Sequence, residues 1–232
     1  MCSRYFLDAD GNIIAYTFRV PVVKDHIRKR FNIAPTQEAP VVRIDREGQR
    51  EVAMLRWGLV PFWAKDLKVG TSMINARSEG IEAKPAFREA VKTRRCIVPA
   101  SGFFEWQGDR PGRKQPFAIT VPQMPIFAFA GLWERWKPAE GAEPTETFTI
   151  VTTDANEAVA RVHDRMPVIL PMGAIDTWLT GPPDAAREVL KPYAGEIALR
   201  AVGTYVSNVN NEGPECLEDA PAPEQPRQQG LF

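Results

Sequence analysis

The sequence is dominated by short runs of β-forming residues that proline, glycine and other turn residues repeatedly interrupt. Clear runs lie at 41–44, 51–57, 96–100, 117–121, 126–133 and 147–152. The first two flank Asp45-Arg46-Glu47-Gly48, a turn signal typical of a hairpin. Short helical patterns at 175–179 and 185–190 are interspersed with the later runs. Many short strands with a few short helices predict one α+β domain.

Local signals give further expectations. Residues 13–20 follow a turn and are rich in β-forming side chains, which favours a strand. Asp154 is placed to cap a short helix over 155–161. From Pro214 the content of Pro, Glu and Gln predicts a disordered tail over 214–232, which leaves a folded domain over 1–213.

Composition excludes several classes of protein. No stretch approaches the ~18 apolar residues that a membrane span needs, and charges within the first ten residues interrupt any apolar leader. We therefore expect a cytoplasmic protein with no membrane association. The three cysteines, Cys2, Cys96 and Cys216, are then expected to be thiols, and their number and separation argue against a zinc site.

The formal net charge is zero, but the two halves of the chain differ. Residues 1–100 hold 18 Lys and Arg against 11 Asp and Glu, and residues 101–232 hold 11 against 18. This asymmetry allows a basic surface for nucleic acid. It equally allows the two halves to pair with each other as the chain folds.

Cys2 offers a distinctive chemistry. Removal of Met1 would leave it with a free α-amine and a thiol on adjacent carbons. The amine can condense with an aldehyde, and the thiol can then close a five-membered thiazolidine. The same group can serve as an amidohydrolase nucleophile. A cysteine at this position without any function is the third alternative.

Two further residues have side chains suited to proton transfer. Glu105 lies in the otherwise apolar segment Gly102-Phe103-Phe104-Glu105-Trp106, where a buried acid needs a partner or a task. It could instead point to water from an alternating strand. His163 suits proton delivery near neutral pH, or it could be a histidine paired with Asp164.

Asn75, Arg77 and Trp63 are candidates for orienting a nucleophile, gripping a phosphate and stacking on an unpaired base, respectively. A loop cap, a surface cation and a core tryptophan explain the same residues equally well.

Together these residues resemble the SOS response-associated peptidase (SRAP) family, whose members crosslink to abasic sites in single-stranded DNA. The resemblance covers the chain in order from residue 1 to about 213. It rests on Met1-Cys2-x-Arg4, Asn32-Ile33-Ala34-Pro35-Thr36, Arg56-Trp57-Gly58-Leu59-Val60-Pro61-x-Trp63, Ile74-Asn75-Ala76-Arg77-x-Glu79, Gly102-Phe103-Phe104-Glu105-Trp106, Val162-His163-Asp164-Arg165-Met166-Pro167 and Val206-Ser207-Asn208-Val209-Asn210-Asn211. Two positions depart from it: Ser3 stands where Gly is common, and Ala64 where a second tryptophan often follows Trp63.

The resemblance implies a role for each matched residue. Cys2 would form the crosslink, Asn75 would position it, and Glu105 and His163 would carry the acid–base steps. The residues expected to contact DNA or line the site are Arg4, Pro35, Trp63, Arg77, Thr152 and Arg165. The expected fold is a single α+β domain with a largely antiparallel, barrel-like β core and short peripheral helices.

Three functional hypotheses follow. The first is a monomeric protein that crosslinks to abasic sites in single-stranded DNA through Cys2 and needs no cofactor or metal. It loses Met1 autocatalytically or to an aminopeptidase, and it has lyase-like activity. The second is a cysteine peptidase or amidohydrolase that uses Cys2. The third is a noncatalytic module that binds single-stranded DNA, in which Cys2 has no role.

Overall fold

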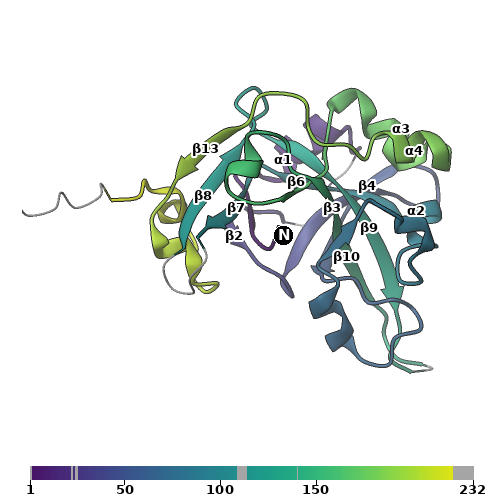
Figure 1. Cartoon of the computed structure of the whole chain (residues 1–232). Helices are drawn as coiled ribbons and strands as arrows, with labels where there is room; N and C mark the ends of the chain where they lie inside the picture. Colours follow the sequence, from purple (N-terminus) through teal and green to yellow (C-terminus); the bar gives the residue numbers. More distant parts are fainter. Residues whose placement is uncertain (1, 22, 24–25, 109–113, 140, 222–232) are drawn as a thin grey trace, which may run out of the picture.

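A computed structural model describes residues 2–21, 23, 26–108, 114–139 and 141–221 of the chain (Figure 1). Two β-sheets form its framework, and helices lie at the periphery. Among the described residues, no helix has the length and apolar character needed to cross a membrane.

Five strands of the larger sheet close on themselves into a barrel. Each pairs with two neighbours in the cycle β10–β4–β3–β6–β9–β10. All these pairings are antiparallel except β4 with β10. The barrel strands are β3 (Glu38–Ile44), β4 (Arg50–Trp57), β6 (Arg95–Ala100), β9 (Phe127–Trp136) and β10 (Thr145–Asp154).

Three short strands extend this sheet. The strand β5 (Asn75–Arg77) runs parallel to β10, whereas β11 (Arg165–Pro167) pairs antiparallel with it. The strand β12 (Ile169–Leu170) pairs with β9. Both β5 and β11 pair with the carboxyl-terminal half of β10, so they extend the sheet at one end of the barrel.

The smaller sheet is antiparallel and has the order β13–β8–β7–β1–β2. Tyr5 on its strand β1 packs edge-to-face against Trp57 and Phe129 of the barrel, which joins the two sheets in one core. The strands are β1 (Tyr5–Leu7), β2 (Arg30–Ile33), β7 (Gly102–Gln107), β8 (Gln115–Thr120) and β13 (Ala198–Ala201).

The helices are short. The α-helices are α1 (Gly11–Phe18), α2 (Ala90–Thr93), α3 (Ile175–Thr180) and α4 (Pro183–Glu188). Turns of 3-10 helix are η1 (Leu67–Ser72), η2 (Ile81–Ala83), η3 (Val159–Arg161), η4 (Met172–Ala174), η5 (Thr204–Ser207) and η6 (Pro214–Leu217). The predicted α+β fold, with its largely antiparallel, barrel-like core and short peripheral helices, is confirmed.

Two local predictions are wrong. Residues 11–18 form helix α1 instead of a strand, because the Asp10 carboxylate caps the helix by accepting from the backbone N–H groups of Asn12 and Ile13. Residues 155–161 form only the turn η3. Asp154 does not cap a helix there, because it ends β10 and its carboxylate pairs with Arg165.

The folded part extends beyond the predicted boundary at residue 213. Cys216 in η6 is fully buried, and Asp219 forms a bridge with Val202 next to β13. The backbone N–H of Gly203 also donates to the carbonyl of Glu218 over 2.9 Å. The first residues of the predicted tail are therefore packed, whereas residues 222–232 lie outside the described residues.

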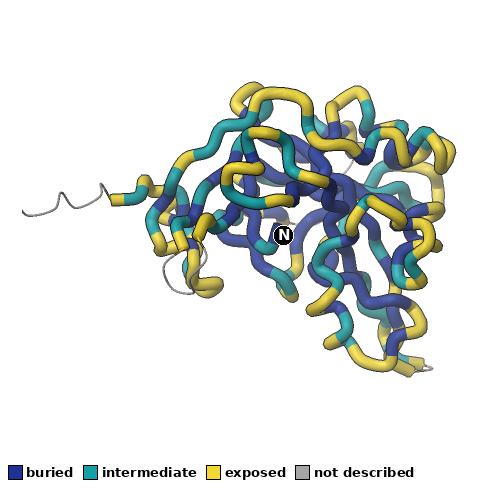
Figure 2. The backbone as a smooth tube through the Cα atoms, in the orientation of Figure 1, coloured by how far each residue is buried: buried dark blue, intermediate teal, exposed yellow. Residues whose placement is uncertain are grey.

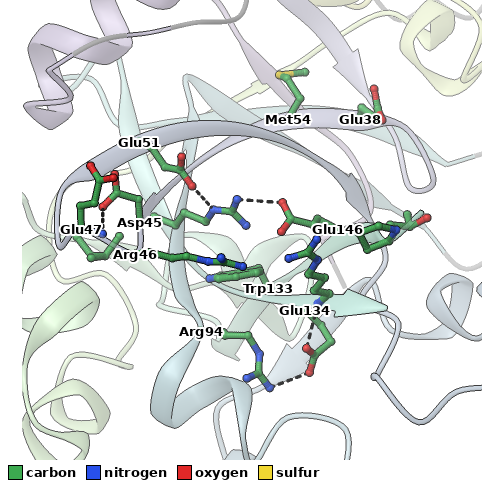
Figure 3. A pocket seen from close by; sticks show the side chains of 15 residues that line it. Glu38, Asp45, Arg46, Glu47, Glu51, Met54, Arg94, Trp133, Glu134 and Glu146 are labelled. Atoms are coloured by element: carbon green, nitrogen blue, oxygen red, sulfur yellow. Dashed lines mark hydrogen bonds and ion pairs between the residues drawn. The ribbon is translucent and has the colours of Figure 1, made fainter. Parts of the chain in front are cut away.

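Charged side chains gather on the larger sheet where β3 and β9 finish and β4 and β10 begin (Figure 3). The Arg43 guanidinium lies 4.2 Å from the centre of the Trp133 ring and pairs with Glu51 over 2.7 Å and Glu146 over 2.9 Å. We call Arg43, Glu51, Trp133 and Glu146, with the neighbouring Arg94–Glu134 pair, the charged cup. It lines a cavity of about 1010 Å³.

Candidate active site

Cys2 lies where the two sheets meet. Its side chain is fully buried, and the chain that follows enters β1 of the smaller sheet. Its backbone carbonyl accepts a hydrogen bond of 2.7 Å from Nδ2 of Asn75, which belongs to the larger sheet. Figure 2 shows that the chain around this junction is largely buried.

The position of Asn75 is fixed by strand pairing. In the parallel register of β5 and β10, Asn75 lies beside Ile150 and Arg77 beside Thr152. The side chains of Asn75 and Arg77 therefore project to the same side of β5, by the two-residue period of a strand. The short strand β5 thus holds Asn75 against the Cys2 carbonyl.

The Cys2 thiol is surrounded by groups that disfavour its ionisation. Burial raises its pKa well above the ordinary value, and the nearby Glu105 carboxylate raises that pKa further. The thiol is therefore protonated at neutral pH. A base has to take its proton when the sulfur attacks.

Glu105 is held inside the smaller sheet. It lies on β7 opposite Phe117 of β8, and only 4% of it is exposed, so the alternative that it points to water is wrong. Burial raises the pKa of Glu105 to about 7. Both its protonated and its ionised form are therefore populated near neutral pH, which lets it donate or accept a proton.

His163 is half-buried between η3 and β11, and burial lowers its pKa. Its Nδ1 lies 2.9 Å from the backbone nitrogen of Arg165 and 2.8 Å from Oδ1 of Asp164. One nitrogen cannot accept from the amide and donate to the carboxylate at once, so the two contacts belong to different protonation states. A neutral Nδ1 accepts from Arg165, and a protonated Nδ1 donates to Asp164.

Glu105 and His163 line one pocket of about 380 Å³. Ser3, the neighbour of Cys2, also lines it, so the pocket lies beside the buried thiol. The remaining lining residues are Arg4, Trp106, Lys114 and Ser207. An acid, an imidazole and an ammonium group thus share one pocket next to Cys2.

A family model described as SOS response associated peptidase (SRAP) matches residues 1–209. The chain belongs to the SRAP family.

Relatives of this SRAP chain come from bacteria and animals. The abasic site processing protein YoqW of Bacillus subtilis is 38% identical over 224 residues, which cover 94% of this chain and 99% of that protein. The abasic site processing protein HMCES of Gallus gallus is 36% identical over 222 residues, which cover 82% of this chain and 66% of that protein. The crystal structure of a Bacteroides thetaiotaomicron protein matches with a TM-score of 0.81 and 27% identity, over 94% of this chain and all of that one.

The SRAP fold brings the four residues predicted to carry the chemistry into one region. Asn75 donates a hydrogen bond to the Cys2 carbonyl, and the Glu105 carboxylate raises the pKa of the Cys2 thiol. Glu105 and His163 share the pocket. The roles assigned to these four residues remain predictions.

Three of the residues predicted to contact DNA are accessible. Trp63 is 51% exposed, so the alternative of a core tryptophan is wrong, and its neighbour Phe62 is 61% exposed. Arg77 is exposed and makes no hydrogen bond or ion pair with other described residues. Pro35 is half-buried in the turn after β2.

The other three, Arg4, Thr152 and Arg165, are buried, although Arg4 also lines the pocket. Nη1 of Arg4 donates to Oδ1 of Asn32 and to the carbonyl of Val206, each over 2.8 Å. The Arg165 guanidinium donates to both carboxylate oxygens of Glu79 over 2.9 Å and also pairs with Asp154. Thr152 is fully buried on β10, and its carbonyl accepts from Arg165.

Sequence reasoning missed Asn32 and Lys114. Asn32 is 1% exposed, and its Nδ2 donates to the carbonyls of Val206, Asn208 and Asn211. It lies in one of the motifs that resemble the family, but partners more than 170 positions away give no local signal. Lys114 lies in no motif, and only the pocket identifies it.

Proposed function

We propose that this protein processes abasic sites in single-stranded DNA by joining Cys2, once Met1 has been removed, to the ring-opened sugar. The observation that carries the proposal is the convergence of Asn75 and Glu105 on Cys2, beside a pocket that Glu105 shares with His163. The relatives named abasic site processing proteins support the substrate class.

The reaction is a condensation that releases one water molecule. Hydrolysis of the Met1–Cys2 bond first frees the α-amine. The amine adds to the C1′ aldehyde of the open sugar, and the carbinolamine loses water to give an imine. The Cys2 sulfur then bonds to the imine carbon while the thiol proton passes, through a base, to the nitrogen, which closes the thiazolidine.

The buried thiol suits this order of steps. Because its pKa is raised, the thiol is a poor nucleophile towards an unactivated amide or aldehyde at neutral pH. An imine formed by the adjacent amine is both activated and held within reach, so ring closure needs only a local base. This argues for crosslinking over a general cysteine peptidase.

Glu105 and His163 can divide the proton transfers. Glu105, with a pKa of about 7, can take the proton from the amine or thiol. His163 has a partner at Nδ1 in either protonation state, so it can deliver a proton. The proton can go to the sugar oxygen as the ring opens, or to the hydroxyl that leaves the carbinolamine. Asn75 holds the Cys2 carbonyl and thereby orients the amine and thiol.

The accessible residues suit a single strand of DNA. Phe62 and Trp63 offer apolar rings on which an unpaired base can stack, and Arg77 offers an exposed guanidinium for a phosphate. Bases paired in a duplex would not be available to such rings.

The test is a denaturing gel with purified protein and single-stranded DNA that carries one abasic site. We expect a covalent protein–DNA band for the wild type and none for Cys2→Ala. The intact mass of the wild-type protein should show the loss of Met1, and a shortened DNA strand would reveal lyase-like cleavage. Retardation on a native gel without any covalent band would favour a noncatalytic DNA-binding module and contradict the proposal.

A further inference from the structure

Lys114 lines the proposed catalytic pocket with an exposed ammonium group. Within the described part of the chain it forms no hydrogen bond or ion pair, and its side chain is exposed. The pocket's other fully charged cation, Arg4, is 7% exposed and is engaged by Asn32 and the Val206 carbonyl. Among the described residues that line this pocket, Lys114 is therefore the cation that is available to a ligand.

The position of Lys114 is set by the same hairpin that carries Glu105. Strands β7 and β8 pair in register, with Glu105 opposite Phe117 and Gln107 opposite Gln115. Lys114 immediately precedes Gln115, so its backbone lies about 10 Å along the strand from the level of Glu105. A lysine side chain can cover much of that distance toward the pocket.

An abasic nucleotide brings a negative charge into this pocket. The sugar has lost its base but keeps a phosphodiester on each side, and each phosphodiester is an anion. An ionised Glu105 would repel such an anion, and the exposed ammonium group of Lys114 nearby offsets that repulsion. The charge of Lys114 already acts within the pocket, since it adds to burial in lowering the pKa of His163.

We propose that Lys114 binds a backbone phosphate adjacent to the abasic sugar and so positions the sugar at Cys2. The inference rests on the proposed function of the pocket. A lysine ammonium acts as a point charge on a phosphate, so Lys114 sets how tightly the lesion is held, whereas Glu105 and His163 act in the chemical steps.

The experiment separates binding from crosslinking. Single-stranded DNA with one tetrahydrofuran residue, which cannot open to an aldehyde, binds without reacting, and fluorescence anisotropy gives Kd at several salt concentrations. We expect Lys114→Ala to raise Kd by roughly three- to tenfold. The slope of the logarithm of the association constant against the logarithm of the salt concentration should become shallower by about 0.7, the value for one phosphate contact on single-stranded DNA.

Two matched variants complete the design. Lys114→Arg keeps the charge and should keep the wild-type salt slope. Lys92→Ala removes an exposed lysine that pairs with Glu89 on α2, and it should leave both Kd and slope unchanged.

An unchanged salt slope for Lys114→Ala would overturn the inference, whether or not Kd rises, because a loss of affinity from altered folding removes no phosphate contact. Failure of the proposed function looks different. In that case the wild type forms no covalent band with abasic DNA on the denaturing gel.

Discussion

Glu105 is a carboxyl group held among apolar strand residues, and burial raises its pKa to about 7. The same burial keeps the Cys2 thiol protonated, and the Glu105 charge reinforces this. A crosslinking reaction that begins with these two groups therefore needs a proton acceptor near neutral pH, a role that Glu105 can fill.

The first prediction concerns the pH dependence of crosslinking. The rate should rise as the pH increases through about 7, because ionised Glu105 is the form that accepts a proton. Glu105→Gln should slow crosslinking by about 100-fold or more and lose this rise. Initial rates between pH 5.5 and 8.5 on a denaturing gel measure both effects. If the crosslinking rate of Glu105→Gln rises with pH in the same way, the rise reports the ionisation of another group.

The second prediction concerns stability at the same residue. A raised pKa means that the folded state binds more protons than the unfolded state between the ordinary pKa of 4.5 and about 7, so stability falls as the pH rises through this window. Glu105→Gln removes this loss. Its Tm at pH 8 should exceed that of the wild type by roughly 3–8 °C.

Thermal unfolding followed by circular dichroism at pH 8 and pH 4.5 provides the control. At the lower pH Glu105 is protonated in the folded wild type, so the two proteins should have similar Tm values. A constant difference in Tm at both pH values would contradict the assignment.

Among elements, the loop from Gly58 to Met73 carries the exposed pair Phe62 and Trp63, and two glycines close it. Gly58 has a φ of 118°, and a Cβ there would lie 2.6 Å from the Gly70 carbonyl oxygen. A Cβ on Gly70 would lie 2.4 Å from the Gly58 carbonyl oxygen. The backbones at the two ends of the loop touch only because neither residue has a side chain.

The third prediction follows from this contact. Gly70→Ala should push the loop away from β4 and displace Phe62 and Trp63, which lowers affinity for single-stranded DNA severalfold and destabilises the fold by about 1–3 kcal/mol. Anisotropy with an undamaged oligonucleotide and urea unfolding measure the two effects. Gly173→Ala, whose Cβ would meet nothing within 4 Å, is the matched control. Equal affinity of both variants for single-stranded DNA would show that the loop does not bind the DNA.

The closing segment from Val206 to Asn211 is a second element fixed from far away in the sequence. Asn32 on β2 donates to three of its carbonyls and accepts from Arg4, while Trp106 donates to Ser207 over 3.0 Å. These contacts shape the wall of the pocket that Arg4, Trp106 and Ser207 form.

The fourth prediction is that Asn32→Ala lowers the free energy of unfolding by about 1–3 kcal/mol, because it leaves the Asn211 carbonyl without its donor and removes one of the two acceptors of the Arg4 guanidinium. Crosslinking should slow as well, since the pocket wall loosens. Urea unfolding and the gel assay measure these effects. Asn210→Ala, in which an exposed side chain of the same segment is removed, should behave like the wild type. Wild-type stability of Asn32→Ala would contradict this role.

These elements also show what the sequence could and could not predict. The barrel strands and the β3–β4 hairpin were predictable because their β-forming runs and turn residues are local signals. Residues 11–18 misled the same reasoning, since the Asp10 cap and the burial of Ile14 and Phe18 one turn apart outweighed their β propensity. The engagement of Arg4 and Arg165 depends on distant partners, which no local pattern records.

At the scale of the whole molecule, the charge asymmetry of the two halves is partly used in joining them. Several arginines of the first hundred residues pair with acids of the remainder: Arg30 with Glu212, Arg43 with Glu146, Arg50 with Asp176, and Arg94 with Glu134. The alternative that the halves pair on folding therefore has direct support. Arg77 of the first hundred residues has no such pairing with other described residues and stays exposed.

The charged cup and the proposed catalytic pocket lie towards opposite ends of β10. Glu146 is near the start of this strand, whereas Ile150 to Thr152 pair with the strand that carries Asn75. Four residues of strand separate Glu146 from Ile150, the partner of Asn75, by about 13 Å. A change in the cup should therefore alter stability without altering the chemistry at Cys2.

The fifth prediction tests this separation. Arg43→Ala leaves Glu51 and Glu146 without their partner and uncovers Trp133, so it should lower the free energy of unfolding by about 2–4 kcal/mol. The crosslinking rate at 25 °C should stay at the wild-type value, because the folded state still predominates. Arg46→Ala removes an exposed arginine that lines the same cavity and has no ion pair with other described residues, so it should change neither quantity. A slower crosslinking rate in folded Arg43→Ala would show that the two ends of the barrel are coupled.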